Sequence, residues 1–309
     1  MLHPLIGSID IDLTGPESAF ERLVPTLPRW TPRAHLRPRH QIDVRIDYGV
    51  PFSPGELLFE QPLVEISRDI RRRLLVTAPK VGAMIGEKEI ELFYEPSASP
   101  RCVQAVFDTL WPLTLPRHGL FHVHGAAVRD EEGRGWLLAG DANIGKSTST
   151  LALVSAGWHF AADDAVYVTH APGFGVMGHG WAEPIRLTAR SAMALGVERD
   201  VPQSELKSNA ILDVSLAARR VDSMGLHRVC FPEFGAETAL RPICAREALE
   251  RLLAASAWIV CVPVLAKAYL ATLAAVASLP ASVVVLGPEL LEQPDLLAEH
   301  LSCAAAAAA

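Results

Sequence analysis

The stretch Gly-Asp-Ala-Asn-Ile-Gly-Lys-Ser, residues 140–147, fits the phosphate-binding pattern G-x-x-x-x-G-K-[ST]. The compact apolar run 136–139 precedes it, and the spacing over 146–156 predicts a helix that stops at Gly157. A strand that delivers such a loop and a helix that leaves it bring backbone N–H groups and the positive helix end to one point. The motif therefore predicts a site for nucleotide phosphates with a divalent metal beside them.

The residues of this motif have separate expected tasks. Lys146 would reach the terminal phosphates and the Ser147 hydroxyl would bind Mg²⁺, so ATP and Mg²⁺ are the expected cofactors. GTP and pyrophosphate remain open as alternative donors, because they present similar phosphates. The expected nucleotide-binding residues are Gly140, Asp141, Ala142, Asn143, Ile144, Gly145, Lys146, Ser147 and Thr148.

The composition sets broad limits on the class of protein. The chain has 309 residues, a formal charge of −7 and 50% hydrophobic residues, which suits one large or two ordinary domains. The acidic balance favours neither nucleic acid nor an anionic membrane as a partner. Five scattered cysteines suit a reducing cytosol, and the N-terminus shows no secretory signal. We therefore expect a cytoplasmic protein.

Two parts with different patterns follow from the order of apolar runs and turn residues. Residues 1–112 are predicted to be a mostly β domain for substrate or partner recognition, because alternation at Ile42, Val44 and Ile46 favours strands. Residues 113–303 alternate strand and helix signals, which predicts an α/β domain, and residues 304–309 are an alanine tail without assigned function. The apolar run 252–266 is interrupted by Pro263, which favours a buried helix or strand over a membrane span.

Individual elements are predicted from the same periodicities. Strands are expected at 120–128, 135–139, 160–168 and 283–286, and helices at 103–110, 146–156, 247–256, 267–278 and 289–301.

Asp163 and Asp164 follow Lys146 closely in the sequence. Neighbouring side chains on a strand point to opposite faces, so both could serve one site only where the strand ends or twists. A kinase needs a carboxylate for its metal and another to accept the proton of the substrate hydroxyl. The pair could divide those roles; a strand-end turn with solvated aspartates is the alternative.

His122 and His124 share a strand face, but no third metal ligand follows at a suitable spacing. A structural hydrogen-bonding role is the simpler interpretation of His124 when this segment is taken alone.

Three blocks, taken together, change that interpretation. His-Gly-Ala-Ala-Val from His124, the motif at 140–147 and Gly-Trp-His-Phe-Ala-Ala-Asp-Asp-Ala-Val from Gly157 resemble the catalytic domain of the HPr kinase/phosphorylase family in order and spacing. The resemblance is firm over residues 120–187 and looser to about 286. It implies a P-loop kinase fold related to phosphoenolpyruvate carboxykinase, and phosphoryl transfer to a serine hydroxyl.

The resemblance also implies roles for single residues. Asp163 matches the family's general base, Asp164 its metal-associated acid and His124 the histidine that supports this pair. Lys146 would hold the β- and γ-phosphates, and Ser147 would complete the metal site. The implied acceptor is a hydroxyl of a peptide, small protein or metabolite, with ribosomal natural-product precursor peptides among the candidates. A homo-oligomer is expected by analogy alone.

The chain departs from the family pattern in two places. Ala142 and Asn143 replace the usual Ser-Gly of the loop, although asparagine tolerates a left-handed backbone. The downstream signature of the HPr enzymes is replaced by Trp-Ala-Glu-Pro-Ile-Arg-Leu, residues 181–187. Within it Glu183 is a candidate third metal-binding acid and Arg186 a candidate charge stabiliser. HPr as substrate and the reverse phosphorylase activity are left open.

Further basic residues are weaker candidates. Lys207, Arg219 and Arg220 could meet a phosphate, and the basic stretch 29–40 could dock an acidic peptide, but solvated surface charge is the simpler interpretation. Two functions thus remain: an ATP- and Mg-dependent serine kinase, which the acidic pair and His124 favour, and a nucleotide-binding regulatory or scaffold protein without transfer activity.

Overall fold

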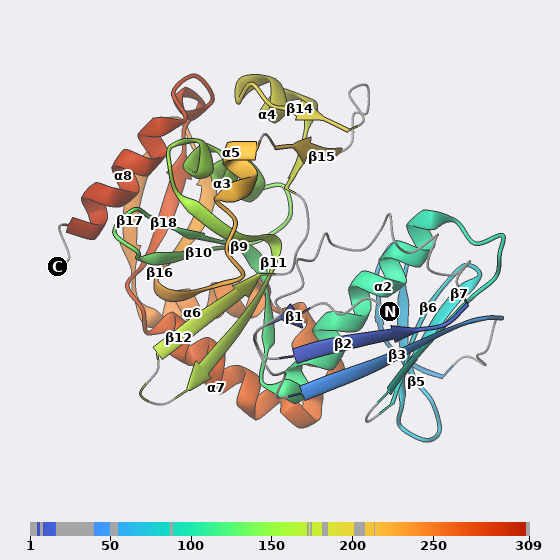
Figure 1. Cartoon of the computed structure of the whole chain (residues 1–309). Helices are drawn as coiled ribbons and strands as arrows, with labels where there is room; N and C mark the ends of the chain where they lie inside the picture. Colours follow the sequence, from blue (N-terminus) through green and yellow to red (C-terminus); the bar gives the residue numbers. More distant parts are fainter. Residues whose placement is uncertain are drawn as a thin grey trace. The chain divides into compact units, whose positions relative to one another are not determined.

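The computed structural model is a mixed α/β structure with two large sheets (Figure 1). It describes residues 5–6, 9–16, 40–49, 55–86, 89–171, 173, 175–180, 185–200, 208–212 and 214–306. The chain divides into two compact units, Met1–Leu120 with Trp258–Ala266, and Phe121–Ala257 with Lys267–Ala309. No pattern in the sequence predicts that Trp258–Ala266 belongs to the first unit.

The first unit is built on an eight-stranded sheet of order β1-β2-β3-β8-β7-β6-β5-β4. Alternating burial of Ile42, Val44 and Ile46 matches the predicted strand pattern. The elements are β1 (Leu5–Ile6), β2 (Ile9–Thr14), β3 (His40–Tyr48), β4 (Glu56–Glu60), β5 (Glu65–Arg68), β6 (Leu74–Ala78), β7 (Val81–Ile85), β8 (Glu89–Tyr94), α2 (Pro100–Thr114) and η1 (Leu115–His118).

Helix α2 runs further than the sequence predicts. Ser99 caps it by accepting a hydrogen bond from the backbone N–H of Cys102, and Pro100 suits the first turn. The helix continues through Pro112 to Thr114, because burial of Leu110, Trp111 and Leu113 outweighs the hydrogen bond that a proline cannot donate.

The second unit carries a seven-stranded sheet of order β10-β9-β11-β12-β16-β18-β17, and a small sheet of order β13-β15-β14. Its elements are β9 (Phe121–Arg129), β10 (Gly135–Ala139), α3 (Lys146–Ser155), β11 (His159–Ala171), β12 (Gly175–Gly180), β13 (Arg186–Leu187), α4 (Ala189–Ala194), β14 (Glu198–Arg199), β15 (Ser208–Ile211), α5 (Val214–Ala218), β16 (Ser223–Phe234), β17 (Ala239–Ile243), α6 (Ala245–Ala254), α7 (Ala266–Ala277), β18 (Ala281–Leu286), η4 (Pro288–Leu291) and α8 (Asp295–Ala306).

Five strands of this sheet pair in a closed circuit. β9 pairs antiparallel with β10 on one side and with β11 on the other, β11 pairs with β12, and β12 pairs with β16. β16 then runs parallel to β10, which closes the circuit. β9 lies between β10 and β11. The end of β10 at Ala139 and the middle of β11 at Asp164 both pair with Gly125, at the centre of β9.

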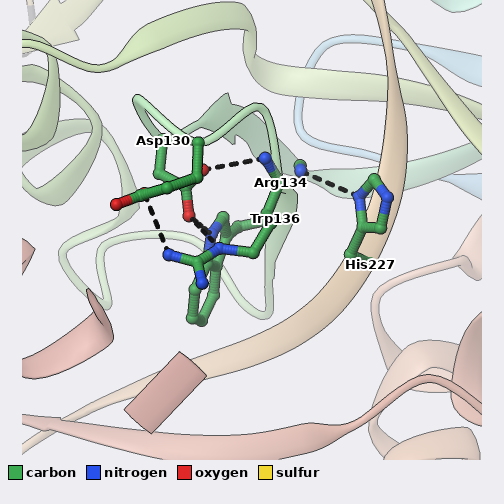
Figure 2. A network of polar contacts seen from close by, with 6 residues as sticks. Asp130, Arg134, Trp136 and His227 are labelled. Atoms are coloured by element: carbon green, nitrogen blue, oxygen red, sulfur yellow. Dashed lines mark hydrogen bonds and ion pairs between the residues drawn. The ribbon is translucent and has the colours of Figure 1, made fainter. Parts of the chain in front are cut away.

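A polar network sets the point where β10 begins (Figure 2). The buried carboxylate of Asp130 accepts hydrogen bonds from the backbone N–H of Arg134 at 2.8 Å, its Nε at 2.7 Å and Trp136 Nε1 at 3.2 Å. The N–H of Gly135 donates to His227 Nδ1 at 3.1 Å. These bonds stabilise the β9–β10 turn and the start of β10, and the glycine motif begins directly after β10 ends at Ala139.

Apolar packing holds α3 and α8 in the core of this unit. Leu151, Leu153 and Val154 of α3 join Leu297 and Leu301 of α8 in a buried cluster with side chains of β9, β10 and β11. This packing fixes the orientation of α3 and therefore of its N-terminal turn.

Two predictions on secondary structure are wrong. The run 252–266 is not one buried element: α6 ends at Ala254, 3-10 helices η2 (Ala257–Cys261) and η3 (Pro263–Leu265) follow, and Val260 and Val264 are exposed. The terminal helix expected at 289–301 begins only at Asp295, after η4, because Pro294 disfavours helix in the residue before it. None of the helices among the described residues has the length and apolar character that crossing a membrane requires.

Candidate functional site

The glycine loop, residues 140–145, leaves β10 and enters α3 as the sequence predicts. Gly140, Asn143 and Gly145 have φ values of 147°, 65° and 94°, which glycine and asparagine adopt more readily than other residues. A Cβ at Gly145 would lie 2.7 Å from Leu286 Cδ1, so any larger residue there would force that side chain to shift. Since Gly145 is the N-cap residue, no side chain caps the first turn of α3.

Lys146, the first residue of α3, has its ammonium folded back onto the loop. Its Nζ donates to the carbonyl oxygens of Gly140 at 2.9 Å and Asp141 at 2.6 Å, and lies 2.9 Å from His124 Nε2. Only 6% of the residue is exposed. The ammonium is therefore held against the loop by these contacts.

His124 joins the loop to the acidic pair. Its backbone carbonyl accepts from the N–H of Gly140 at 3.2 Å, and its own N–H donates to the carbonyl of Ala255 at 2.7 Å. Because an ammonium only donates, the contact with Lys146 makes Nε2 an acceptor and leaves the ring hydrogen on Nδ1. Nδ1 lies 3.1 Å from the carbonyl oxygen of Asp164 and 3.2 Å from its Oδ1.

The two aspartates lie within β11 rather than at its end. Asp163 pairs with Ala126 of β9 and Asp164 with Gly125, one position from His124. Asp163 is buried, with 3% of its surface exposed, whereas the Asp164 side chain is 49% exposed. Asp164 has a φ of 98°, which departs from strand geometry. A strained backbone of this kind costs about 1–3 kcal/mol and occurs most often at functional sites.

A cavity of about 170 Å³ opens in front of the loop. Lys146, Ser147 and Arg186 line it, together with Asn143 and Thr148. Two cationic side chains, a hydroxyl and the start of a helix surround this space, which is the donor set that phosphate oxygens prefer. The cavity thus brings Arg186 to the predicted phosphate site from a segment 40 positions beyond it.

Other predicted residues lie elsewhere. Glu183 and Lys207 fall outside the described residues. Arg219 Nη1 donates to the carbonyl of Gly157, in the turn after α3, and so is bound away from the loop. The Thr148 hydroxyl donates to Ser191 Oγ at 2.9 Å.

His122, the neighbour of His124 on the same strand face, is buried, and this burial lowers its pKa to about 3. Within the part of the chain that the structure describes, no three His, Cys, Asp or Glu side chains gather into a metal-binding group.

The oxygen ligands nevertheless fit Mg²⁺. Mg²⁺ is commonly held by one or two carboxylates and by substrate phosphates, without a full protein cage. The hydroxyl of Ser147 and the half-exposed carboxylate of Asp164 supply hard oxygen atoms of this kind. They are the described residues that would hold the ion.

Several lining residues had no signal in the sequence. Ser191 of α4 and Phe234 at the end of β16 border the cavity, yet neither belongs to a motif. Phe234 is 68% exposed, which is unusual for a phenylalanine and would have been visible only in a structure.

Comparison with known proteins finds similar chains among the solved structures. No family model and no curated protein matches the chain. Among solved structures, it is similar to the Hpr(Ser) kinase/phosphatase from Coxiella burnetii at 13% sequence identity and a TM-score of 0.32. That match covers 59% of this chain and 96% of the other chain. The assignment of the site therefore rests on the residues described above.

Proposed function

We propose that this protein is an ATP- and Mg²⁺-dependent kinase that transfers a phosphoryl group to a serine or similar hydroxyl of a peptide, small protein or metabolite. One observation carries the proposal. The ammonium of Lys146 in the G-x-x-x-x-G-K-[ST] motif lies 2.9 Å from His124, whose other ring nitrogen lies 3.2 Å from the carboxylate of Asp164. These contacts join Asp164 to the phosphate-binding lysine, and a kinase needs a carboxylate of this kind for its metal.

Phosphoryl transfer depends mainly on positioning and on stabilising negative charge. The N–H groups of the first turn of α3 would bind phosphate oxygens. Lys146 would exchange its loop carbonyls for the β- and γ-phosphates, and Arg186 would neutralise charge from the other wall of the cavity. Bound Mg²⁺ would add positive charge beside the transferring group, held by Ser147 and Asp164.

The two aspartates receive different roles in this proposal. Asp164, exposed and beside His124, is the metal-associated acid, and His124 keeps its carboxylate oriented. Asp163 is the general base that accepts the proton of the acceptor hydroxyl, as the sequence resemblance implies. Asp163 is 3% exposed and lines neither cavity beside the loop, so an acceptor hydroxyl would reach it only after the side chains around it move. The Nδ1 hydrogen of His124 stays on the ring throughout.

The test is a phosphoryl-transfer assay with γ-labelled ATP and Mg²⁺. Acceptors are peptides encoded beside the gene and a small-molecule extract, and nucleotide affinity is measured in parallel by calorimetry. Lys146→Ala should weaken ATP binding by at least tenfold, while Lys267→Ala, which removes an exposed lysine of α7, should not. Asp163→Asn should abolish labelling and leave ATP affinity within about threefold.

The outcomes separate the candidate functions. A wild-type protein that binds Mg·ATP but labels no acceptor would be a nucleotide-binding regulatory or scaffold protein. Labelling that persists in Asp163→Asn would remove that residue as the base. A wild-type protein that binds neither ATP nor pyrophosphate would refute the phosphate site itself.

A further inference from the structure

The hydroxyl of Thr148, in the first turn of α3, forms its hydrogen bond outside its own helix. Threonine in a helix often donates to the carbonyl four positions earlier, as Thr150 does to Lys146 at 2.9 Å. The Thr148 hydroxyl instead donates to Ser191 Oγ of α4 at 2.9 Å, across 43 positions of the sequence. The residue that directly follows the phosphate-binding motif is therefore tied to a distant segment.

Ser191 is bonded to a second hydroxyl as well. Thr188, the N-cap residue of α4, donates from Oγ1 to Ser191 Oγ at 3.1 Å and accepts from the Ser191 backbone N–H at 3.2 Å. A serine hydroxyl has two acceptor positions, and the two threonines fill both. Thr148, Ser191 and Thr188 thus form a continuous hydroxyl bridge from α3 to the segment before α4.

The segment that carries Arg186 lies at the other end of this hydroxyl bridge. β13 consists of Arg186 and Leu187, and it belongs to the small sheet, whose strands have two to four residues. Strands this short need packing against other elements to be stable. Leu187 supplies such packing in the buried cluster around α3, but apolar contact has no preferred direction, whereas a hydrogen bond does.

The hydroxyl bridge lies in the wall of the phosphate cavity. Thr148, Thr188 and Ser191 line this cavity together with Arg186. Thr148 and Ser191 also line a larger cavity of about 400 Å³, which extends to Leu290. The bridge therefore ends two positions from the arginine that would meet phosphate oxygens from this wall.

We infer that Ser191 is a positioning residue for Arg186. By accepting from both threonines, it fixes the start of α4 against the first turn of α3 and so holds the guanidinium at the phosphate cavity. Contact between arginine and phosphate depends on the orientation of the planar guanidinium, so a loosened segment would weaken it. This inference rests on the proposed function of the glycine loop and adds to it the side chains that orient its second cation.

The test is a double-mutant cycle on Mg·ATP affinity, measured by titration calorimetry with the full-length protein. Arg186→Ala should weaken binding by about tenfold, and Ser191→Ala by about fivefold, because the arginine keeps its charge but loses its fixed orientation. If Ser191 acts through Arg186, the double variant should bind within about twofold of Arg186→Ala. Independent effects would instead multiply to about fiftyfold.

Three further variants complete the design. Thr148→Val cuts the hydroxyl bridge from the α3 side and should weaken binding as Ser191→Ala does. Ser191→Thr keeps a hydroxyl at this position and should restore affinity to within about twofold of the wild type. Thr150→Val is the matched control, because it removes a hydroxyl that bonds within α3, and it should leave the affinity unchanged. Urea denaturation checks that each variant is folded.

The inference and the function beneath it fail in different ways. Wild-type affinity in Ser191→Ala or in Arg186→Ala would overturn the positioning role and leave the phosphate site standing. Multiplied effects in the double variant would do the same, because Ser191 would then act independently of Arg186. No binding of Mg·ATP by the wild type would overturn both the inference and the proposed function.

Discussion

Replacing Gly145 by alanine perturbs the last residue of the glycine loop and the first turn of α3 together. The residue has a φ of 94°, a conformation that costs an L-amino acid about 1–2 kcal/mol. The added Cβ would also lie 2.7 Å from Leu286 Cδ1. That atom ends a flexible side chain, so the contact can be relieved by an off-rotamer shift of about 0.5–1.5 kcal/mol. We expect Gly145→Ala to lower the free energy of unfolding by about 2 kcal/mol.

Gly133→Ala is a matched control for this variant. Gly133 has a φ of 85°, and nothing lies within 4 Å of the position that its Cβ would take. It should therefore show the conformational cost without the contact with Leu286. The difference between the two variants, measured by urea denaturation, should be about 0.5–1.5 kcal/mol.

Ligand binding gives the second measurement. Gly145→Ala disfavours the backbone conformation that directs the first-turn N–H groups of α3 toward a phosphate, so its affinity for Mg·ATP should fall by tenfold or more, whereas Gly133→Ala should bind normally. If Gly145→Ala proves as stable as Gly133→Ala and binds Mg·ATP like the wild type, the argument that the loop requires glycine at this position is refuted.

Three further predictions concern single side chains. Asp164→Gly should be at least as stable as the wild type, because glycine adopts a φ of 98° readily. Asp164→Ala should be less stable than Asp164→Asn by about 1 kcal/mol in urea denaturation, because asparagine tolerates a positive φ better than alanine does. Equal stabilities of the alanine and asparagine variants would contradict the strain at this residue. Asp130→Ala should lower the free energy of unfolding by about 1–3 kcal/mol, because it leaves the buried donor Trp136 Nε1 without its acceptor, and a loss below 1 kcal/mol would contradict this. His122→Phe should reduce the loss of stability in acid. The pKa of His122 is lowered from 6.5 to about 3, so the unfolded chain binds a proton first, and the free energy of unfolding falls as the pH drops from 6.5 toward 3, by about 1.4 kcal/mol between pH 7.5 and 5.5. If the variant and the wild type show the same dependence of stability on pH, the burial of a neutral imidazole at His122 is contradicted.

The sequence predicts the strand, loop and helix around residues 135–156 to within a residue or two. These elements are determined locally, since the glycines, the apolar run and the helical periodicity all lie within one short segment. The expectation that His124 and the aspartates belong to the same site came from the resemblance. The contact of His124 with Lys146 depends on the pairing of β9 with β10, and no local pattern encodes that pairing.

The cavities could not be predicted, for a related reason. Arg186, Ser191, Phe234 and Leu290 come from four separate segments, and none has a spacing that marks it as functional. The positive φ of Asp164 was equally hidden, because a strand pattern predicts alternation and says nothing of a single residue that departs from it. Roles for the aspartates thus remain predictions for the variants described above.

The assignment of Trp258–Ala266 to the first unit has a consequence for dissecting the protein. The chain passes between the units after Leu120, after Ala257 and after Ala266, so no single cut separates them. A shortened chain that starts at Phe121 would still carry Trp258, whose ring lies 5.8 Å from that of Phe59 in the intact first unit, and would leave it without that neighbour. Separate expression would require joining Ala257 to Lys267 by a short linker and supplying the excised segment to the other half. Until that is done, proteolysis at exposed loops and hydrogen exchange on the whole chain are the better ways to learn which unit unfolds first.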